Sequence, residues 1–76
     1  MRYADGTDVR LGDVVTMSGS AGRVVCVIGD RRFTDEFSEA NWGHLQRGAL
    51  IEFEQFGLIY YEHEPETDIS FVDRQP

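Results

Sequence analysis

Residues 49–64, with the sequence ALIEFEQFGLIYYEHE, form the stretch that decides the fold. Ile51 and Phe53 alternate with Glu52 and Glu54, which is the two-residue period of a strand with one buried and one solvated face. A glycine and a second apolar run follow. We therefore expect a β-hairpin that supplies the largest part of the core and also the most acidic surface.

The turn of this hairpin is expected next to Gly57, because glycine tolerates the positive φ of tight turns. With residues 55 and 56 as the loop, Phe53 lies opposite Leu58, and apolar side chains share one face. In that register Ile59 lies opposite Glu52, which fits less well, and a longer loop would change the pairing. The pattern predicts the hairpin and leaves its register open.

Charge divides the chain into two unequal parts. Fourteen acidic residues stand against seven arginines and no lysine, which gives a net charge of −7. Residues 48–76 hold seven of the acids and only Arg74, a net charge of −6. Such a field repels phosphate backbones and attracts basic surfaces, so a basic protein partner is favoured over nucleic acid. The simpler interpretation is that the acids only keep a small domain soluble.

The length of 76 residues fits one domain, residues 1–76, with no room for a deep enclosed active site. A hydrophobic content of 41% is enough for a packed core without disulfides or metal. The single cysteine, Cys26, cannot form an internal disulfide, which fits a reducing compartment. No segment approaches the ~20 apolar residues of a membrane span, and the start has no signal-peptide pattern. We expect a cytoplasmic protein.

Short strands separated by glycine turns make up the rest of the chain. Turns are expected at residues 5–6 and 12–13, and a loop of small residues at 18–22. Residues 14–17 and 69–72 are rich in residues that favour strands, and residues 23–28 are apolar on both faces, as in a central strand. Together with the hairpin, these segments predict a mostly β protein.

One short helix is expected at about residues 39–46. Ser38 fits the N-cap position, and Phe37 can pack on Trp42 as a hydrophobic staple. Gly48 stands where a helix usually ends, and Gly43 weakens the helix by ~1 kcal/mol relative to alanine. Five to six short strands with one such helix predict a small, partly open antiparallel barrel, which leaves few exposed strand edges.

Two segments carry a resemblance to a known class of barrels. Residues 9–15, VRLGDVV, and residues 22–27, GRVVCV, resemble the opening of KOW-type and other Src-homology-3-like barrels. In those barrels a Gly-Asp turn leads into one strand and Gly-x-Val begins the next. The match covers about a third of the chain. It implies a Src-homology-3-like fold, and a nucleic-acid-binding or ribosome-associated role.

A broader pattern is similar to a family of short bacterial proteins of unknown function. It spans nearly the whole chain and brings no catalytic residues with it. One departure is Ser38, where a proline is expected to open the helix. The pattern consists of Tyr3-Ala4-Asp5-Gly6-Thr7, Leu11-Gly12-Asp13, Gly22-Arg23-Val24-Val25, Asp35-Glu36-Phe37, Trp42, Leu45, Gly48, Gly57-Leu58-Ile59 and Tyr61.

The residues that could carry chemistry favour a non-enzyme without cofactor or metal. Cys26 lies among valines, where a thiol acts as a small hydrophobic group. His44 and His63 lack the spacing of paired metal ligands. Glutamates that alternate along a strand stay equally solvated, whereas acid-base catalysis needs carboxyls with separated pKa values. We therefore expect no catalytic, cofactor-binding or metal site.

The function expected from these observations is binding of a protein with a basic surface. The chain would act as an inhibitor or immunity-type protein, or as a phage-type nucleic-acid mimic against a defence complex. The alternative is a KOW-like nucleic-acid-binding module that uses Arg23, Arg31 and Arg32, and a homodimer through a strand edge also fits. The expected partner-binding residues combine charge with aromatic anchors: Glu52, Glu54, Phe56, Tyr60, Tyr61, Glu62 and Glu64.

Overall fold

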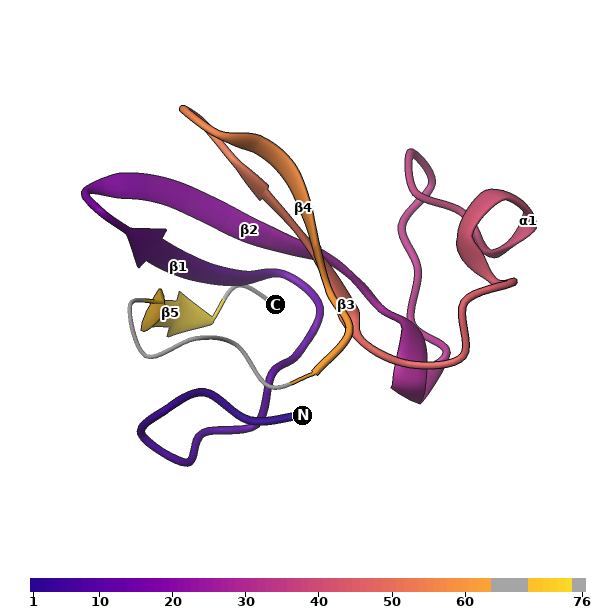
Figure 1. The fold of residues 1–76 in the computed structure, drawn as a ribbon, viewed down its shortest axis with the longest axis horizontal. Coiled ribbons are helices and arrows are strands. Elements are labelled where there is room, and N and C mark those ends of the chain that lie inside the picture. Colours follow the sequence, from indigo (N-terminus) through magenta and orange to yellow (C-terminus); the bar gives the residue numbers. More distant parts are fainter. Residues whose placement is uncertain (64–68, 75–76) are drawn as a thin grey trace.

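The computed structural model describes residues 1–63 and 69–74, and its main feature is one antiparallel sheet of five strands (Figure 1). The strand order is β4-β3-β2-β1-β5, so β4 and β5 are the two edges and the sheet is not closed. The mostly β fold with one short helix is confirmed. The elements are β1 (Asp13–Met17), β2 (Ser20–Val27), a 3₁₀ turn η1 (Ile28–Asp30), α1 (Glu39–Trp42), β3 (Ala49–Phe53), β4 (Gly57–Tyr61) and β5 (Ile69–Arg74).

The segment before β1 forms a tight loop rather than a sixth strand. A single bridge joins Arg2 to Asp8, and Gly6 turns the chain with φ 90°. The chain then reverses at Gly12, with φ 88°, and enters β1. The turns predicted at residues 5–6 and 12–13 are confirmed, because both glycines adopt conformations that other residues avoid.

The loop predicted at residues 18–22 is shorter than expected. Ser18 and Gly19 alone connect β1 to β2, with φ 51° and 80°, the two positive values that a type I′ hairpin turn requires. Ser20 is buried at the start of β2, and its hydroxyl accepts a hydrogen bond of 3.1 Å from the backbone N–H of Gln55. The small residues at 20–22 favour a loop by composition, but they belong to β2. There Ser20 bonds to Gln55, and Gly22 lies against the ring of Phe53.

The apolar part of the central strand β2, Val24–Val27, is buried on both faces as predicted, whereas Arg23 before it is exposed. A bulge explains how both faces are covered. Val24 pairs with Ile51 and Cys26 pairs with Leu50, which leaves Val25 as an extra residue. The bulge turns both Val25 and Cys26 to the same side of the sheet, whereas Val24 lies on the other. The carbonyl of Val25, displaced from the ladder, accepts a hydrogen bond of 3.0 Å from the Thr34 hydroxyl.

The main core lies on the inner face of the curled sheet. All five strands and the N-terminal loop contribute to it, and Gly22 leaves room for the ring of Phe53, its cross-strand partner. A Cβ at Gly22 would lie 2.5 Å from Cδ1 of that ring. The buried members of this core are Tyr3, Val9, Val15, Val24, Val27, Ala49, Ile51, Phe53 and Ile69.

A second, smaller core lies on the outer face, beneath the segment that contains α1. Residues of β2, η1 and β3 form its buried part, namely Val25, Cys26, Ile28 and Leu50. Phe33, Phe37, Trp42 and Leu45 cover them. This segment projects to one side of the sheet in Figure 1.

The helix is half as long as predicted and ends at Trp42 instead of residue 46. Gly43 takes the C-cap position and donates a hydrogen bond of 2.7 Å to the Glu39 carbonyl. Ser38 occupies the N-cap position as expected, but its side chain makes no capping bond. With one glycine after four residues and no side-chain cap, the propensity for a longer helix is weak, and packing of Trp42 sets its extent.

A buried ion pair joins the first and last parts of the sheet. The Asp13 carboxylate is fully buried and accepts hydrogen bonds from Tyr3 Oη at 2.7 Å, from the Arg10 backbone N–H at 2.9 Å and from Arg74 Nε at 2.8 Å. Arg74 also donates to the carbonyl of Asp8 at 2.8 Å. These bonds tie the N-terminal loop and β5 to β1, so the network stabilises the fold.

Candidate functional site

The β3–β4 hairpin is the candidate site, and its register differs from the predicted one. Phe53 pairs with Gly57 and Glu52 with Leu58, so the loop has three residues, 54–56, rather than two. Gly57 has φ 76°, the left-handed conformation that closes three-residue hairpin loops. A shift of one residue moves side chains to the opposite face, and Leu58 therefore lies on the outer face instead of opposite Phe53.

Two of the predicted site residues lie on the outer face of this hairpin. Glu52 is exposed there, and Leu58 and Tyr60 beside it are each 37% exposed. The Tyr60 hydroxyl donates a hydrogen bond of 2.6 Å to the Arg47 carbonyl, which fixes the direction of the ring. An acidic group and two apolar side chains thus share one exposed face.

Two further predicted residues, Glu54 and Phe56, lie in the loop at the tip. Phe56 is the most exposed of the predicted aromatic residues, at 47%, and its ring meets the buried ring of Phe53 edge-on at 6.1 Å between centroids. The backbone N–H of Glu54 donates a hydrogen bond of 2.9 Å to the Ala21 carbonyl, and Gln55 is bonded to Ser20. These bonds hold the tip against β2, so the loop presents its side chains from a fixed backbone.

The remaining predicted residues lie elsewhere. Tyr61 belongs to the inner face, where it packs on the main core and its hydroxyl donates to Met17 Sδ at 3.6 Å. Glu62 follows β4, forms an ion pair with Arg47 at 3.1 Å and lies 3.5 Å from Nε2 of His63. Glu64 lies outside the described residues. The exposed site therefore contains Glu52, Glu54, Phe56 and Tyr60, with Glu62 at its margin.

Leu58 is the site residue that sequence reasoning missed. A two-residue loop would turn the Leu58 side chain inward, toward the core. The misfit of Ile59 opposite Glu52 was the signal for the correct register, since a three-residue loop pairs Ile59 with Ile51 instead.

A hollow on the outer face adjoins the hairpin. It has a volume of about 520 Å³ and includes Val14, Arg23, Glu52 and Glu54 in its lining. Arg23 pairs with Glu52 across β2 and β3, and both side chains are exposed. A partner side chain could enter here between a cation and two carboxylates.

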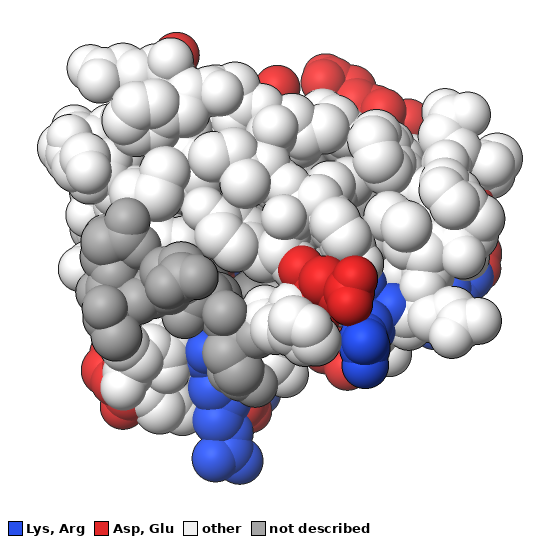
Figure 2. Space-filling model, in the orientation of Figure 1, with Lys and Arg blue, Asp and Glu red and all other residues white. Residues whose placement is uncertain are grey.

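The charged side chains are unevenly distributed over the face shown in Figure 2. Acidic side chains lie along its upper margin with no arginine beside them on that face, partly on the side of the β3–β4 tip and partly toward the segment that contains α1. Lower down, arginines lie next to acidic side chains, and the middle is uncharged. The acidic margin therefore extends beyond the hairpin, and within the hairpin Glu52 lies opposite Arg23 of β2.

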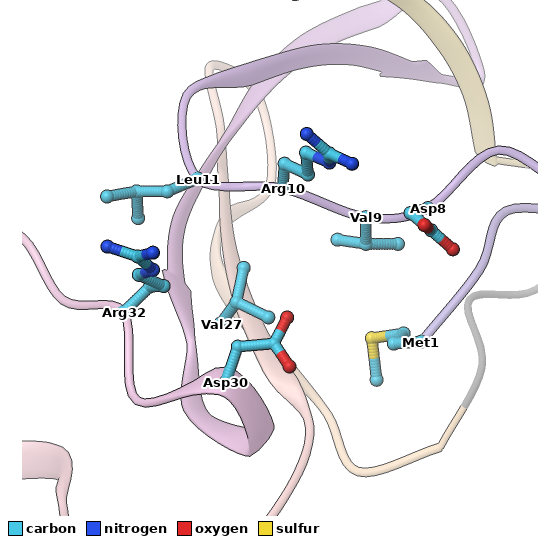
Figure 3. Close-up of a pocket in the computed structure, with 8 residues that line it drawn as sticks. All are labelled: Met1, Asp8, Val9, Arg10, Leu11, Val27, Asp30 and Arg32. Atoms are coloured by element: carbon cyan, nitrogen blue, oxygen red, sulfur yellow. The ribbon is translucent and has the colours of Figure 1, made fainter.

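A second hollow, of about 630 Å³, lies between the N-terminal loop and η1 (Figure 3). Its charged lining residues are Asp8, Arg10, Asp30 and Arg32. The formal charges of these two carboxylates and two guanidinium groups cancel. The four side chains are exposed, which weakens any single contact they make.

The arginines proposed for nucleic acid do not form one basic surface. Arg23 lies on the outer face of β2, and Arg32 lines the hollow next to Asp30. Arg31 turns away with φ 56°, forms an ion pair with Glu39 and donates to the Gly43 carbonyl at 3.2 Å. The adjacent pair in the sequence is thus divided between two places in the fold.

Side chains such as Cys26 and Tyr3, which could in principle take part in chemistry, are buried and bonded within the fold. Cys26 is buried, its Sγ lies 3.0 Å from the Phe37 carbonyl, and burial raises the pKa of the thiol. The pKa of Tyr3 is raised far above its usual range by burial and by its bond to Asp13. Within residues 1–63 and 69–74, no group of three His, Cys, Asp or Glu side chains could hold a metal ion. No helix in that part of the chain is long and apolar enough to span a membrane.

Comparison of the chain with family models, with curated proteins and with solved structures finds no match. The geometry of the hairpin and the distribution of charge are therefore the basis on which a function can be argued.

Proposed function

We propose that this chain is a non-catalytic binding module whose β3–β4 hairpin occludes a basic surface of another protein. The observation that carries the proposal is the outer face of the hairpin, where the exposed apolar side chains of Leu58 and Tyr60 lie beside Glu52. Phe56 and Glu54 repeat the same combination at the tip.

Each kind of side chain has a separate part in such binding. Aromatic and apolar groups bury area at the centre of an interface and supply most of its affinity. The carboxylates steer a basic partner and raise its association rate, an effect that salt screens. A chain with a net charge of −7, of which −6 belongs to residues 48–76, is suited to this division of labour.

The proposal includes a setting and two biological forms. The module acts in the cytoplasm, as an inhibitor or immunity-type protein against a toxin with a basic site, or as a mimic of nucleic acid against a defence complex. In both forms its carboxylates replace phosphates on the partner. The curled sheet would then be a partly open variant of a Src-homology-3-like barrel.

A KOW-like nucleic-acid-binding module is the alternative, based on the resemblance of residues 9–15 and 22–27 to such barrels. It requires Arg23, Arg31 and Arg32 to act together, and the ion pair of Arg31 with Glu39 opposes this. The two functions differ in which residues control binding and in what is bound.

Affinity capture of the tagged protein from its own cells, at low and moderate salt, tests the proposal. The E52Q/E54Q/E62Q variant is compared with D30N/D35N/E36Q, which also loses three exposed acids and so has the same net charge, −7 + 3 = −4. We expect a basic protein to be retained by the wild type and by the second variant, and lost with the first. Equal retention by both variants would refute the hairpin as the site. Recovery of nucleic acid that depends on Arg31 and Arg32 would establish the alternative.

A further inference from the structure

Among the described residues, 1–63 and 69–74, no strand pairs with the outer edge of β4, and the directions of the N–H and C=O groups of β4 follow from the neighbouring strands. The N–H of Glu54 points to β2, where it binds the Ala21 carbonyl, and the Gly48 carbonyl accepts a bond from Ile28 on the same side. Successive residues of a strand point to alternate sides, so Ile51 and Phe53 bond to β4. Their partners on β4 are Ile59 and Gly57.

Leu58 and Tyr60 therefore direct their backbone N–H and C=O groups away from the sheet. No described backbone bond outside the strands involves either residue. Since β4 is the last strand in the order β4-β3-β2-β1-β5, these groups form an open pairing edge within the part of the chain that the structure describes. Figure 1 shows β4 with no described strand on its outer side.

The β4 edge also lacks the features that keep sheet edges from pairing. Natural edges carry charges, prolines or bulges that interrupt the repeat. The opposite edge, β5, has such features, because Val72 is an extra residue in its pairing with β1 and Asp73 and Arg74 follow it. β4 pairs regularly over all five residues, Gly57–Tyr61, and contains no charge and no proline.

We propose that an extended segment of the basic partner adds to the sheet as a new strand along β4. This inference rests on the proposed function and specifies how the hairpin binds. The main-chain bonds would come from Leu58 and Tyr60, and the side chains of the same residues would pack against the added strand. Addition of a strand to an exposed edge is a general way in which proteins bind extended peptides.

The positions of the acids indicate the sequence of that segment. Glu54 precedes β4 and Glu62 follows it, while the strand between them is uncharged. The complementary segment is therefore an uncharged, β-forming run of about five residues with Arg or Lys at each end, since opposite charges stabilise neighbouring positions on paired strands.

Charge also argues against a second copy of this chain as the occupant. Antiparallel pairing of β4 with itself, centred on Ile59, would place Glu62 opposite Phe56 of the other copy and close to its Glu54. Like charges at neighbouring positions on paired strands are destabilising. Each copy would also bring its net charge of −7 to the contact.

Amide hydrogen exchange with a defined probe tests strand addition. The probe is the peptide acetyl-Arg-Thr-Val-Thr-Val-Thr-Arg-amide. Its control has the same sequence and charge but an N-methyl group on each of the five central residues, which removes their donors from both edges of the peptide. With the peptide at about ten times its dissociation constant, we expect exchange of the Leu58 and Tyr60 amides to slow about tenfold. The amide of Ile59, already bonded to β3, should change far less.

Two variants separate main-chain pairing from side-chain contact. L58P removes the outward donor without removing a bond of the sheet, and L58T keeps the donor while also losing the leucine. We expect L58P to abolish binding and L58T to weaken it only in part. Thermal unfolding and the NMR spectrum of L58P show whether β3 and β4 stay paired. The N-methylated control peptide tests main-chain pairing with β4 on the unaltered protein.

The inference is overturned if neither amide is protected, if the N-methylated control peptide protects them equally, or if the unmodified peptide fails to bind at millimolar concentration. It is also overturned if both amides are protected without peptide and sedimentation shows a dimer, because a second copy then occupies the edge. Binding that shifts the NMR signals of Glu52, Glu54 and Glu62 without protecting the amides would reject strand addition and leave the proposed function standing. Loss of the proposed function is recognised separately, by capture that does not depend on those glutamates.

Discussion

The buried carboxylate of Asp13 allows a quantitative test of what holds this small sheet together. Its Oδ2 accepts from Tyr3, from the Arg10 backbone and, at 3.4 Å, from Arg74 Nη2, whereas Oδ1 accepts from Arg74 Nε at 2.8 Å. In the D13N variant, an amide oxygen at the Oδ2 position keeps its bonds. The amide nitrogen at the Oδ1 position then faces the Arg74 Nε donor, so the shorter Arg74 bond is lost and the guanidinium no longer faces a carboxylate.

We expect D13N to lose about 2–4 kcal/mol of unfolding free energy. Each hydrogen bond to a charged group contributes about 1.5–3 kcal/mol, and removal of one partner of a buried ion pair costs about 3–5 kcal/mol. The Arg74 side chain is 38% exposed, so water can solvate its guanidinium in the variant and recover part of the lost free energy. The expected loss therefore lies toward the lower of these values. A domain of this size has a stability of about 4–11 kcal/mol, so the change is large.

Urea unfolding followed by circular dichroism and by Trp42 fluorescence measures this loss. The matched control is D8N, whose carboxylate pairs with Arg2 at 3.3 Å with both side chains largely exposed. We expect D8N to change stability by less than about 0.5 kcal/mol, because exposed pairs contribute little. A D13N protein as stable as D8N would refute the assignment of the network as a main support of the fold.

The pH dependence gives the same test a second readout. Burial raises the pKa of Asp13, but hydrogen bonds from Arg74, the Arg10 backbone and Tyr3, with the charge of Arg74, outweigh it and lower the pKa below its usual value. Stability from this group is therefore complete above about pH 4, the ordinary pKa of Asp, and is lost as the pH falls below it. D13N should lose less stability than the wild type over that acid range. An unchanged acid slope would contradict the reasoning.

Three further outcomes follow from the packing. G22A should lose about 1–3 kcal/mol in urea unfolding, because its Cβ would overlap the ring of Phe53, whereas G29A, with no atom within 4 Å of the added Cβ, should stay close to the wild type. The Cys26 thiol should react with a disulfide reagent only as fast as the protein opens, and complete labelling within seconds under native conditions would show that it is accessible. The raised pKa of Tyr3 predicts that stability present below about pH 10 is lost as the pH rises above it, and Y3F should lack this alkaline loss.

The elements that sequence reasoning placed well have strong local causes. Gly6 and Gly12 turn the chain because they adopt positive φ. The apolar run that follows Arg23 forms the central strand, because a strand that is apolar on both sides is stable only where other parts of the protein bury both of its faces. Such signals act over a few residues and do not depend on the rest of the fold.

The elements that were misplaced depend on distant contacts. The bulge at Val25 is supported by Thr34, and residues 20–22 are strand because Gly22 lies under Phe53. The burial of Asp13 depends on Arg74, which is 61 positions away in the chain. Local propensity contains none of this information, because each case depends on a partner brought near only by the fold.

The candidate site was predicted in part. A three-residue loop in place of a two-residue loop moved Leu58 and Tyr60 together from the inner to the outer face. The half-burial of Tyr61 and the ion pair of Glu62 with Arg47 were not visible in the sequence pattern. The acidic and aromatic composition of the hairpin was visible, but the arrangement of its faces required the register.

NMR mapping of the complex with the captured protein shows whether the hairpin contacts a basic partner. We expect the signals of residues 52–62 to change on binding, with those of Glu52, Phe56, Leu58 and Tyr60 changing most. Changes centred on Arg10 and Arg32 in the hollow of Figure 3, with the hairpin unaffected, would contradict the proposed function and place the binding site between the N-terminal loop and η1.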